Sequence, residues 1–263
     1  MNRDGVELSV DGGVACVTIR RPEARNALSR ATIEAFVDTV HTLAARADLR
    51  AVVVTGGDGA FIAGGDLNDL HGLETHSDGA ALSDAMQAAL STLSRLTVPV
   101  AAAIDGPAIG GGVEVALACD VRFAGPTARI ALRQIDLGVT TGWGGARRLL
   151  ALVGRGRTLD LLWTGATLDA VSAAEVGLVE YVVRAPDTAL TAAMRWATMI
   201  AERSPLAVSS IKALVSSLDA PQADYEALER AVFAKTWASD EHAVAVRAFV
   251  EARARRRAPG LVE

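Results

Sequence analysis

The sequence predicts an α/β protein whose strands and helices alternate through the first half of the chain. Short runs rich in β-branched or small apolar residues lie at 14–19, 51–55 and 98–104. The last two are apolar throughout, as expected of strands buried on both faces. Amphipathic helical segments separate the three runs, and strand signals fade from about Gly142 onward. This alternation is typical of a sheet covered by helices.

The individual elements follow from local signals. A helix is expected to begin after Ser29, a good N-cap residue, and to present one apolar face: Ile33, Phe36, Val37, Val40 and Leu43. A second helix precedes the third strand and carries a similar face: Leu82, Ala85, Met86, Ala89, Leu90 and Leu93. A third helix is expected around Glu114, followed by two short strands at 121–124 and 129–132.

The C-terminal part reads as helical. A capping box is predicted at Ser172–Glu175, and Ser204 followed by Pro205 predicts another helix start. Further helices are expected over 224–237 and 240–256. We therefore divide the chain into a core at 1–195 and a helical region at 196–263, which packs on its own core or on a neighbouring subunit.

Composition limits the partners. The net charge of -5 gives no general reason to expect nucleic acid or an anionic membrane surface. A basic cluster near the C-terminus is expected to be a solvated face: Arg253, Arg255, Arg256 and Arg257. Cys16 and Cys119 are too few for a disulfide framework, and no apolar stretch approaches a leader or a membrane span. We expect a soluble cytoplasmic protein.

Two glycine-rich turns follow two of the buried strands. "GGDGAFIAGGDLNDL" follows the run at 51–55, and "DGPAIGGGVEV" follows the run at 98–104. Glycine allows close approach of the backbone, and free amides at a helix start suit an anion or a developing oxyanion. The alternative is that each turn only connects a strand to a helix. Neither matches a phosphate loop or a dinucleotide fingerprint.

Glu114 interrupts the apolar helix that follows the second turn. An ionised carboxylate is rarely buried without a partner, so Glu114 is either paired internally or faces a cavity. His71 and His76 lie among acidic residues but match no metal-ligand spacing, so no metal site is expected. No serine lies in a nucleophile-elbow motif.

Five ordered segments resemble the enoyl-CoA hydratase/isomerase (crotonase) family: "RPEARNALS", "FIAGGDLNDL", "DGPAIGGGVEVALACDVRFA", "LGVTTGWGGARRLLALVG" and "GATLDAVSAAEVGLVEYVV". The resemblance implies a spiral of ββα units followed by a helical trimerisation region. It implies an acyl-CoA thioester substrate, no separate cofactor, no metal, and a homotrimer or a dimer of trimers. The amides of Gly65 and Gly111 would form an oxyanion hole, with Glu114 as acid/base. Other positions would bind substrate or CoA: Arg25, Ala60, Ala63, Gly64, Asp66, Leu67, Gly110, Trp143 and Phe249.

The sequence departs from the family pattern at the second catalytic position. Hydratases of the family carry a glutamate twenty residues after the first, and here that position is Gln134. An amide can orient water but cannot exchange a proton with it, which lowers the expectation of efficient hydration. Loss of CO₂ from an alkylmalonyl thioester needs only one proton source, and "GWGG" at 142–145 resembles the ethylmalonyl-CoA decarboxylase branch. Three hypotheses remain: hydratase or isomerase, decarboxylase, and non-catalytic acyl-CoA binder.

Overall fold

The computed structural model describes residues 2–70, 73, 75–218 and 244. The chain divides into two compact units, Met1–Ala201 and Glu202–Glu263. Every strand in the described residues belongs to the first unit. None of the helices in these residues has the length and apolarity needed to cross a membrane.

The main sheet has seven strands in the order β1-β2-β3-β4-β5-β7-β9. Their bounds are Asn2–Arg3, Val6–Asp11, Val14–Ile19, Ala51–Gly56, Val100–Ile104, Val121–Ala124 and Tyr181–Val182. β2 pairs antiparallel with β1 and β3, whereas all the pairs from β3 to β9 are parallel. A separate two-stranded parallel sheet joins β6 (Pro107–Ile109) to β8 (Arg129–Ala131).

Helices follow most of the parallel strands. In the first unit they are α1 (Arg30–Ala44), α2 (Leu67–Leu70), α3 (His76–Ser94), α4 (Gly111–Leu117), α5 (Gly145–Thr164), α6 (Ala170–Glu175) and α7 (Ala189–Ala201), with short 3₁₀ turns η1 (Pro22–Ala24) and η2 (Arg133–Leu137). The second unit contributes α8 (Pro205–Leu218). The Ser29 hydroxyl caps α1 by accepting the Thr32 amide, and the Ser204 hydroxyl accepts the Ala207 amide at the start of α8.

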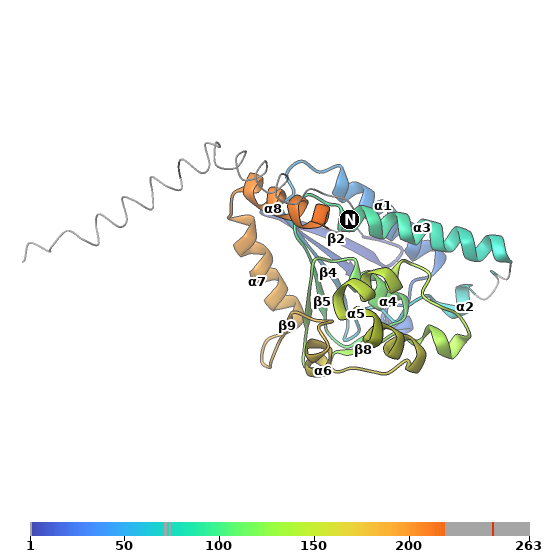
Figure 1. Ribbon diagram of the computed structural model, residues 1–263. Helices are drawn as coiled ribbons and strands as arrows, with labels where there is room; N and C mark the ends of the chain where they lie inside the picture. The colour runs from blue at the N-terminus through green and yellow to red at the C-terminus, as the bar shows by residue number, and fades with distance from the viewer. Residues whose placement is uncertain (1, 71–72, 74, 219–243, 245–263) are drawn as a thin grey trace, which may run out of the picture. The chain divides into compact units, whose positions relative to one another are not determined.

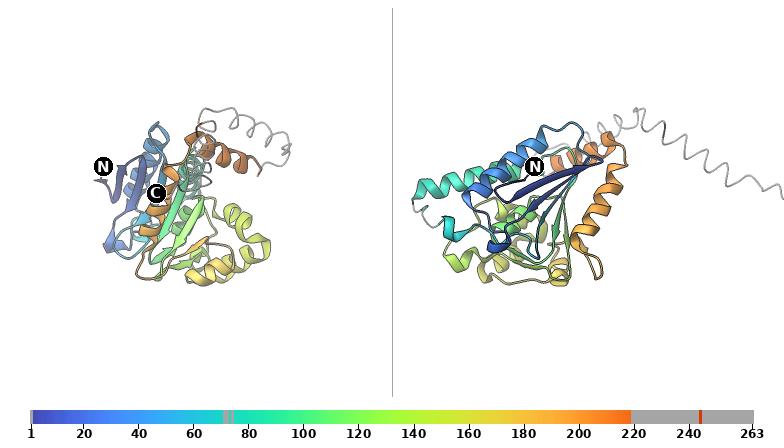
Figure 2. Two further views of the ribbon diagram at one scale, coloured as in Figure 1. Left: turned by 90° about the vertical axis from the view of Figure 1, so that its left-hand side faces the viewer. Right: turned by 180° about the vertical axis from the view of Figure 1, so that it is seen from behind.

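The sheet is buried on both faces because successive residues of β4 alternate between two apolar clusters. Ala51 and Val53 lie in the cluster formed with α7, whereas Val52 and Val54 lie in the cluster formed with α1 and α3. The ribbon shows α7 on one side of the sheet and α1 with α3 on the other (Figure 2). Both faces of a central strand are therefore excluded from water, as its uninterrupted apolar run predicts.

The predicted α/β architecture is confirmed, with the three main strands at or within two residues of their expected bounds. β2 and the short β9 were not predicted: β2 is a half-exposed strand whose sequence mixes polar and apolar residues. The predicted capping box at Ser172 is wrong. Asp169 is the N-cap of α6 and accepts the Ser172 amide at 2.8 Å, so the helix begins before Ser172. The helix expected over 224–237 and the basic cluster lie outside the described residues, and of the helix expected over 240–256 the structure describes residue 244 alone.

Candidate active site

The two glycine-rich segments lie side by side beyond β4 and β5. Ile62 forms a parallel bridge with Ala108, and the Ile109 amide donates to the Ile62 carbonyl at 3.0 Å. This pairing brings the next residues of both segments together, so that a Cβ placed on Gly64 would lie 3.5 Å from the Gly111 nitrogen. Two turns far apart in sequence thereby meet at the start of α4, the helix labelled in Figure 1.

The second segment is fixed by close packing against groups that exclude any side chain. A Cβ on Gly111 would lie 2.1 Å from the Trp143 indole, and one on Gly112 would lie 1.9 Å from the Ile62 carbonyl oxygen. Non-bonded heavy atoms cannot approach so closely, because carbon contacts are optimal at about 3.5–4.0 Å. Glycine at these two positions is therefore a steric requirement of the site.

Each glycine segment offers one backbone amide to the space between them. The Gly64 carbonyl accepts the Leu28 amide at 2.8 Å. Because C=O and N–H point in opposite directions across a trans peptide, the Gly65 N–H points away from Leu28. Gly111 is the first residue of α4, where an amide has no carbonyl acceptor within the helix. Gly65 and Gly111 both line the same cavity.

Glu114 lies on α4 and is held by donors from a different part of the chain. Its side chain is buried, and the residue is only 2% exposed. One carboxylate oxygen, Oε2, accepts the amides of Trp143 and Gly145, both at 2.8 Å. The other, Oε1, accepts the Gln134 side-chain amide at 2.9 Å and the Gly142 amide at 3.4 Å. The carboxylate thus occupies the N-terminus of α5, where free amides and the helix dipole favour an anion.

Two opposing effects act on the proton affinity of this carboxylate. Burial raises the pKa of Glu114 above its ordinary value of 4.5, and the bonds from Gly145, Trp143, Gly142 and Gln134 act in the opposite direction. Arg148 lies close by and donates to the Trp143 carbonyl at 2.9 Å. Burial lowers the pKa of Arg148, while the negative charge of Glu114 acts to raise it. A carboxyl group with a raised pKa can exchange a proton at a pH nearer neutrality.

Gln134, on η2, is one of the groups that contact Glu114. Its amide nitrogen donates to Glu114, which directs the amide oxygen Oε1 elsewhere. That oxygen is buried and has no hydrogen-bond partner within the described residues. A buried carbonyl without a donor costs about 1–3 kcal/mol, so this oxygen is suited to accept a hydrogen bond from a bound molecule.

The cavity beside these groups has a volume of about 490 Å³. It extends from the two glycine segments to α2, α3 and the chain between η2 and α5, and most of its wall is apolar. The apolar side chains in its wall are Leu67, Leu70, Leu82, Ile109, Leu137, Val139 and Trp143. A space of this size and polarity suits a small or medium-sized acyl group with few polar contacts.

The structure brings together most of the predicted site residues. The cavity is lined by Ala63, Gly64, Gly65, Leu67, Gly110, Gly111, Glu114, Gln134 and Trp143. Arg25, Ala60 and Asp66 do not line it. Arg25 is exposed, Ala60 is buried, and Asp66 forms an ion pair with Arg21. Phe249 lies outside the described residues.

Sequence reasoning missed other residues that line the same cavity, among them Ser83, Arg133, Leu137 and Thr140. Ser83 lies on the predicted helix before β5, but on its polar side, which periodicity assigns to solvent. Asp136 also lines the cavity and forms an ion pair with Arg133 at 3.4 Å. Its position on a 3₁₀ turn could not be derived from sequence spacing, because such turns have no fixed extent.

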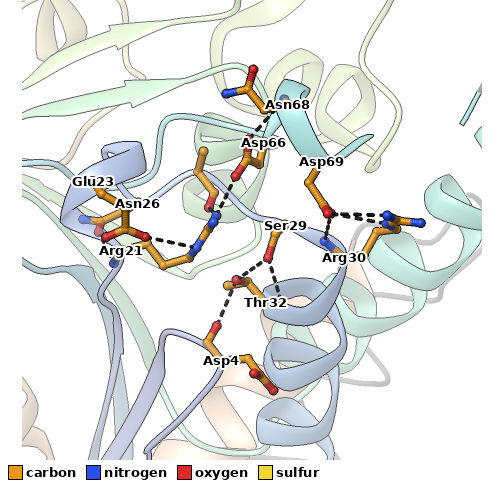
Figure 3. Close-up of polar contacts among 11 residues, drawn as sticks. Asp4, Arg21, Glu23, Asn26, Ser29, Arg30, Thr32, Asp66, Asn68 and Asp69 are labelled. Atoms are coloured by element: carbon orange, nitrogen blue, oxygen red, sulfur yellow. Dashed lines mark hydrogen bonds and ion pairs between the residues drawn. The ribbon is translucent and has the colours of Figure 1, made fainter. Parts of the chain in front are cut away.

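Polar ties hold the first glycine segment to the loop before α1. The buried Asn26 side chain donates to the carbonyls of Gly57 and Ala60, each at 2.7 Å. Arg21 points toward Asp66, and Arg30 points toward Asp69 (Figure 3). These contacts add to the close packing of the first segment, in which a Cβ on Gly56 would lie 1.9 Å from the Phe61 carbonyl oxygen.

No group of three or more His, Cys, Asp or Glu side chains in the described part of the chain could hold a metal ion. His71 and Glu74, two members of the acidic and histidine-containing loop, are not among the described residues.

The fold and the site together define a class of α/β enzyme that combines paired backbone amides with one buried carboxylate in an apolar cavity. Residues 9–256 match the family model described as "Enoyl-CoA hydratase/isomerase". The chain belongs to the enoyl-CoA hydratase/isomerase family, also called the crotonase superfamily.

Individual relatives agree with this assignment over almost the full chain. The short-chain-enoyl-CoA hydratase of Clostridium acetobutylicum is 33% identical over 96% of this chain and 97% of its own length. The crystal structure of an enoyl-CoA hydratase from Bacillus anthracis superposes with a TM-score of 0.88 at 29% identity, covering 94% of this chain and 96% of that one. An enoyl-CoA hydratase from Polaromonas gives a TM-score of 0.87 at 28% identity, covering 97% and 98%.

Proposed function

We propose that this enzyme binds an acyl-CoA thioester and forms an enolate, or an enolate-like transition state, within the cavity. The amides of Gly65 and Gly111 would donate to the thioester oxygen, and Glu114 would transfer the proton. The observation that supports this most strongly is that a single cavity is lined by both glycines and by Glu114. Donors directed at a developing oxyanion stabilise it most effectively when they are preorganised and shielded from water.

The contacts of Glu114 favour a role as base in the resting enzyme. A carboxylate has about four lone-pair positions, and four donors already contact this one. The bond from Gly142 is the longest at 3.4 Å, so it is the one most readily exchanged for a substrate proton. Desolvation raises the pKa of Glu114, which makes the carboxylate a stronger base than an exposed glutamate.

Hydration or double-bond isomerisation is the reaction we favour. The unpartnered oxygen of Gln134 could accept a hydrogen bond from a water molecule, which Glu114 would then deprotonate. The alternative is decarboxylation of an alkylmalonyl-CoA of the methylmalonyl or ethylmalonyl type. It is favoured by Gln134 itself: an amide at this position supplies no second proton, and loss of CO₂ requires only one proton to reach the α-carbon.

Incubation with mixed acyl-CoAs and mass spectrometry would distinguish these reactions. The mixture contains 2-enoyl, 3-enoyl and alkylmalonyl thioesters, and products of equal mass are separated by chromatography. Addition of water to the 2-enoyl species would support hydration, and conversion of 3-enoyl to 2-enoyl would support isomerisation. Loss of CO₂ with both enoyl species unchanged would support the decarboxylase. Binding without any conversion would indicate a non-catalytic acyl-CoA-binding protein.

The substitution Gln134→Glu sharpens the same assay. A glutamate there would place a second carboxyl group within hydrogen-bond distance of Glu114, so the pair would share a proton at neutral pH. We expect faster hydration of the 2-enoyl thioester, since a general acid/base typically contributes about 10²–10⁴-fold. If this variant hydrates no faster than the wild type, Gln134 does not occupy the second catalytic position.

The remaining assignments extend the family pattern. Arg25 and the segment 60–63 would contact the CoA moiety, and no cofactor beyond the CoA of the substrate would be needed. The region 196–263 would mediate assembly into a trimer or a dimer of trimers, with Phe249 near a CoA site. Light scattering of the purified chain would test the assembly. We expect a cytoplasmic enzyme.

A further inference from the structure

A single guanidinium group connects the two backbone segments that orient the Gly65 amide. Arg21 Nη1 donates to the carbonyl of Ala27 and lies 3.0 Å from the Asp66 carboxylate. Ala27 directly precedes Leu28, and Asp66 directly follows Gly65. Leu28 and Gly65 form the parallel bridge that sets the direction of the Gly65 N–H.

Backbone hydrogen bonds connect the same two segments on both sides of the bridge between Leu28 and Gly65. The Leu28 amide donates to the Gly64 carbonyl at 2.8 Å, and the Asp66 amide donates to the Leu28 carbonyl at 2.9 Å. An isolated bridge of two hydrogen bonds has no neighbouring ladder to support it. Arg21 supplies that support, because its Nη1 atom contacts Ala27 in one segment and Asp66 in the other.

The ion pair of Arg21 with Asp66 is well shielded from solvent, unlike the neighbouring pair of Arg30 on α1 with Asp69 on α2. The side chains of Arg21 and Asp66 are 20% and 12% exposed, whereas those of Arg30 and Asp69 are 59% and 34% exposed. Shielded charge pairs are less screened by salt than exposed pairs, so this contact depends less on ionic strength than the exposed one. The Arg21 amide also donates to the Asn26 side chain at 2.7 Å, which limits movement of the arginine backbone.

From this geometry we infer that Arg21 and Asp66 are positioning residues that hold the Gly65 N–H in line with the thioester oxygen. The inference rests on the proposed function, in which Gly65 is an oxyanion donor. It assigns Asp66 to the support of the oxyanion hole in place of direct substrate contact. A hydrogen-bond donor displaced by about 1 Å can cost roughly 100-fold in rate, so such support has a measurable effect.

Asp66→Asn tests the inference, with Asp69→Asn as the matched control. Both variants exchange a carboxylate for an amide on the same segment, and each removes one ion pair to an arginine. Three quantities are compared: kcat and KM for the thioester converted by the wild type, the melting temperature, and the infrared carbonyl stretch of bound hexanoyl-CoA carrying ¹³C at the thioester carbon. The stretch reports hydrogen bonding at the carbonyl directly.

We expect Asp66→Asn to lower kcat about 10- to 100-fold with a smaller change in KM, and to move the carbonyl band back toward its frequency in water. Asp69→Asn should leave kcat and the band unchanged. Arg21→Met should lower kcat at least as much as Asp66→Asn, because it also removes the donor to the Ala27 carbonyl. The double variant should be no slower than Arg21→Met, because the ion pair is already lost in that variant.

Two outcomes would contradict different parts of the account. If Asp66→Asn lowers the melting temperature but leaves kcat and the carbonyl band as in the wild type, the ion pair is only structural and the inference is wrong. If the band of hexanoyl-CoA bound to the wild type shows no shift to lower frequency, the oxyanion hole itself is wrong, and with it the proposed function.

Discussion

The two glycine segments that meet at the cavity are held in place by different kinds of interaction. Around Gly111 the backbone is fixed by contact: the Trp143 indole and the Ile62 carbonyl leave no volume for a side chain. Around Gly65 the nearest atom to an added Cβ is the flexible end of Leu70, at 2.7 Å, and the backbone is held by the bridge to Leu28 and the ion pair of Arg21 with Asp66. The same functional group, a backbone amide, is thus oriented by packing on one side and by charge and hydrogen bonding on the other.

This difference implies that the two glycine segments are sensitive to different kinds of substitution. A packed segment responds to any added atom, since protein interiors have few voids to relax into. A segment that also depends on hydrogen bonds and an ion pair responds in addition to loss of charge or of a hydrogen-bond partner. The following substitutions test this contrast in order of expected effect.

Glu114→Gln addresses the carboxylate on the packed side and should have the largest effect. Loss of a general acid/base costs about 10²–10⁴-fold in rate, so we expect kcat to fall within that range while acyl-CoA still binds. Turnover and binding of a saturated acyl-CoA are measured side by side. Because a glutamine NH₂ would face the Trp143 and Gly145 amides, the melting temperature is compared as well. Glu175→Gln, on the exposed side of α6, is the control. Wild-type turnover in Glu114→Gln would remove Glu114 from the chemistry.

Gly111→Ala should be the next most damaging change, because the added methyl group would meet the Trp143 ring at 2.1 Å. We expect a loss of about 10²–10³-fold in kcat, comparable with removal of an oxyanion donor, together with a lower melting temperature. Gly156→Ala, at an exposed position of α5 that does not line the cavity, is the control, since a Cβ there meets no atom within 4 Å. A variant as active as the wild type would show that packing against Trp143 does not orient this amide.

Asn26→Ala removes polar ties from the other side without adding volume. Two buried carbonyls, of Gly57 and Ala60, would lose their donor, and each unsatisfied group costs about 1–3 kcal/mol. We expect a reduced free energy of unfolding in urea and weaker binding of free CoA, with a smaller effect on kcat than Gly111→Ala. Unchanged stability would mean that water replaces the amide of Asn26 at no cost.

Arg148→Met should have a smaller effect, visible in the pH dependence. Burial raises the pKa of Glu114, and a base must be ionised, so kcat/KM rises with pH through that pKa. The Arg148 cation favours the ionised carboxylate, so its removal should move the acid limb of the profile to higher pH. Arg147→Met is the control, because Arg147 is an exposed neighbour on the same helix. If the acid limb of the kcat/KM profile shifts equally in Arg148→Met and Arg147→Met, a specific effect of Arg148 is excluded.

Glu114 also makes the stability of the fold depend on pH. The dependence has the opposite sign from that of a salt-bridged carboxylate, whose pKa is lowered on folding. Because its pKa is raised on folding, the contribution of Glu114 to stability is present at low pH and is lost as pH rises from about 4.5 through the pKa of the folded state. The ionised form that the proposed mechanism requires is therefore the less stable one. This trade-off is common where a buried charge serves a reaction.

Features set by local sequence were predictable. The apolar run at 51–55 and the Ser29 cap gave β4 and the start of α1, and the carboxylate within an apolar helix marked Glu114 as facing either a partner or a cavity. The structure shows both, since Glu114 accepts four hydrogen bonds and also lines the cavity.

Features set by long-range contact were not predictable. The family resemblance placed Gln134 beside Glu114, but nothing in a strand or helix period brings the backbone amides of 142–145 to α4. The ion pair of Asp66 was equally hidden, because its partner Arg21 lies on a different loop and the motif around Asp66 suggested substrate contact. Pairings of this kind depend on how loops meet after the sheet has formed.

The central claim is that Gly65, Gly111 and Glu114 together generate a thioester enolate. Exchange of the α-protons of hexanoyl-CoA in D₂O, followed by mass spectrometry, tests it most directly, because exchange requires the enolate and no further chemistry. The account predicts that the wild type incorporates deuterium at the α-carbon and that Glu114→Gln and Gly111→Ala do so far more slowly. Exchange at the same rate in all three proteins, or no exchange by a wild-type enzyme that binds hexanoyl-CoA, would contradict it.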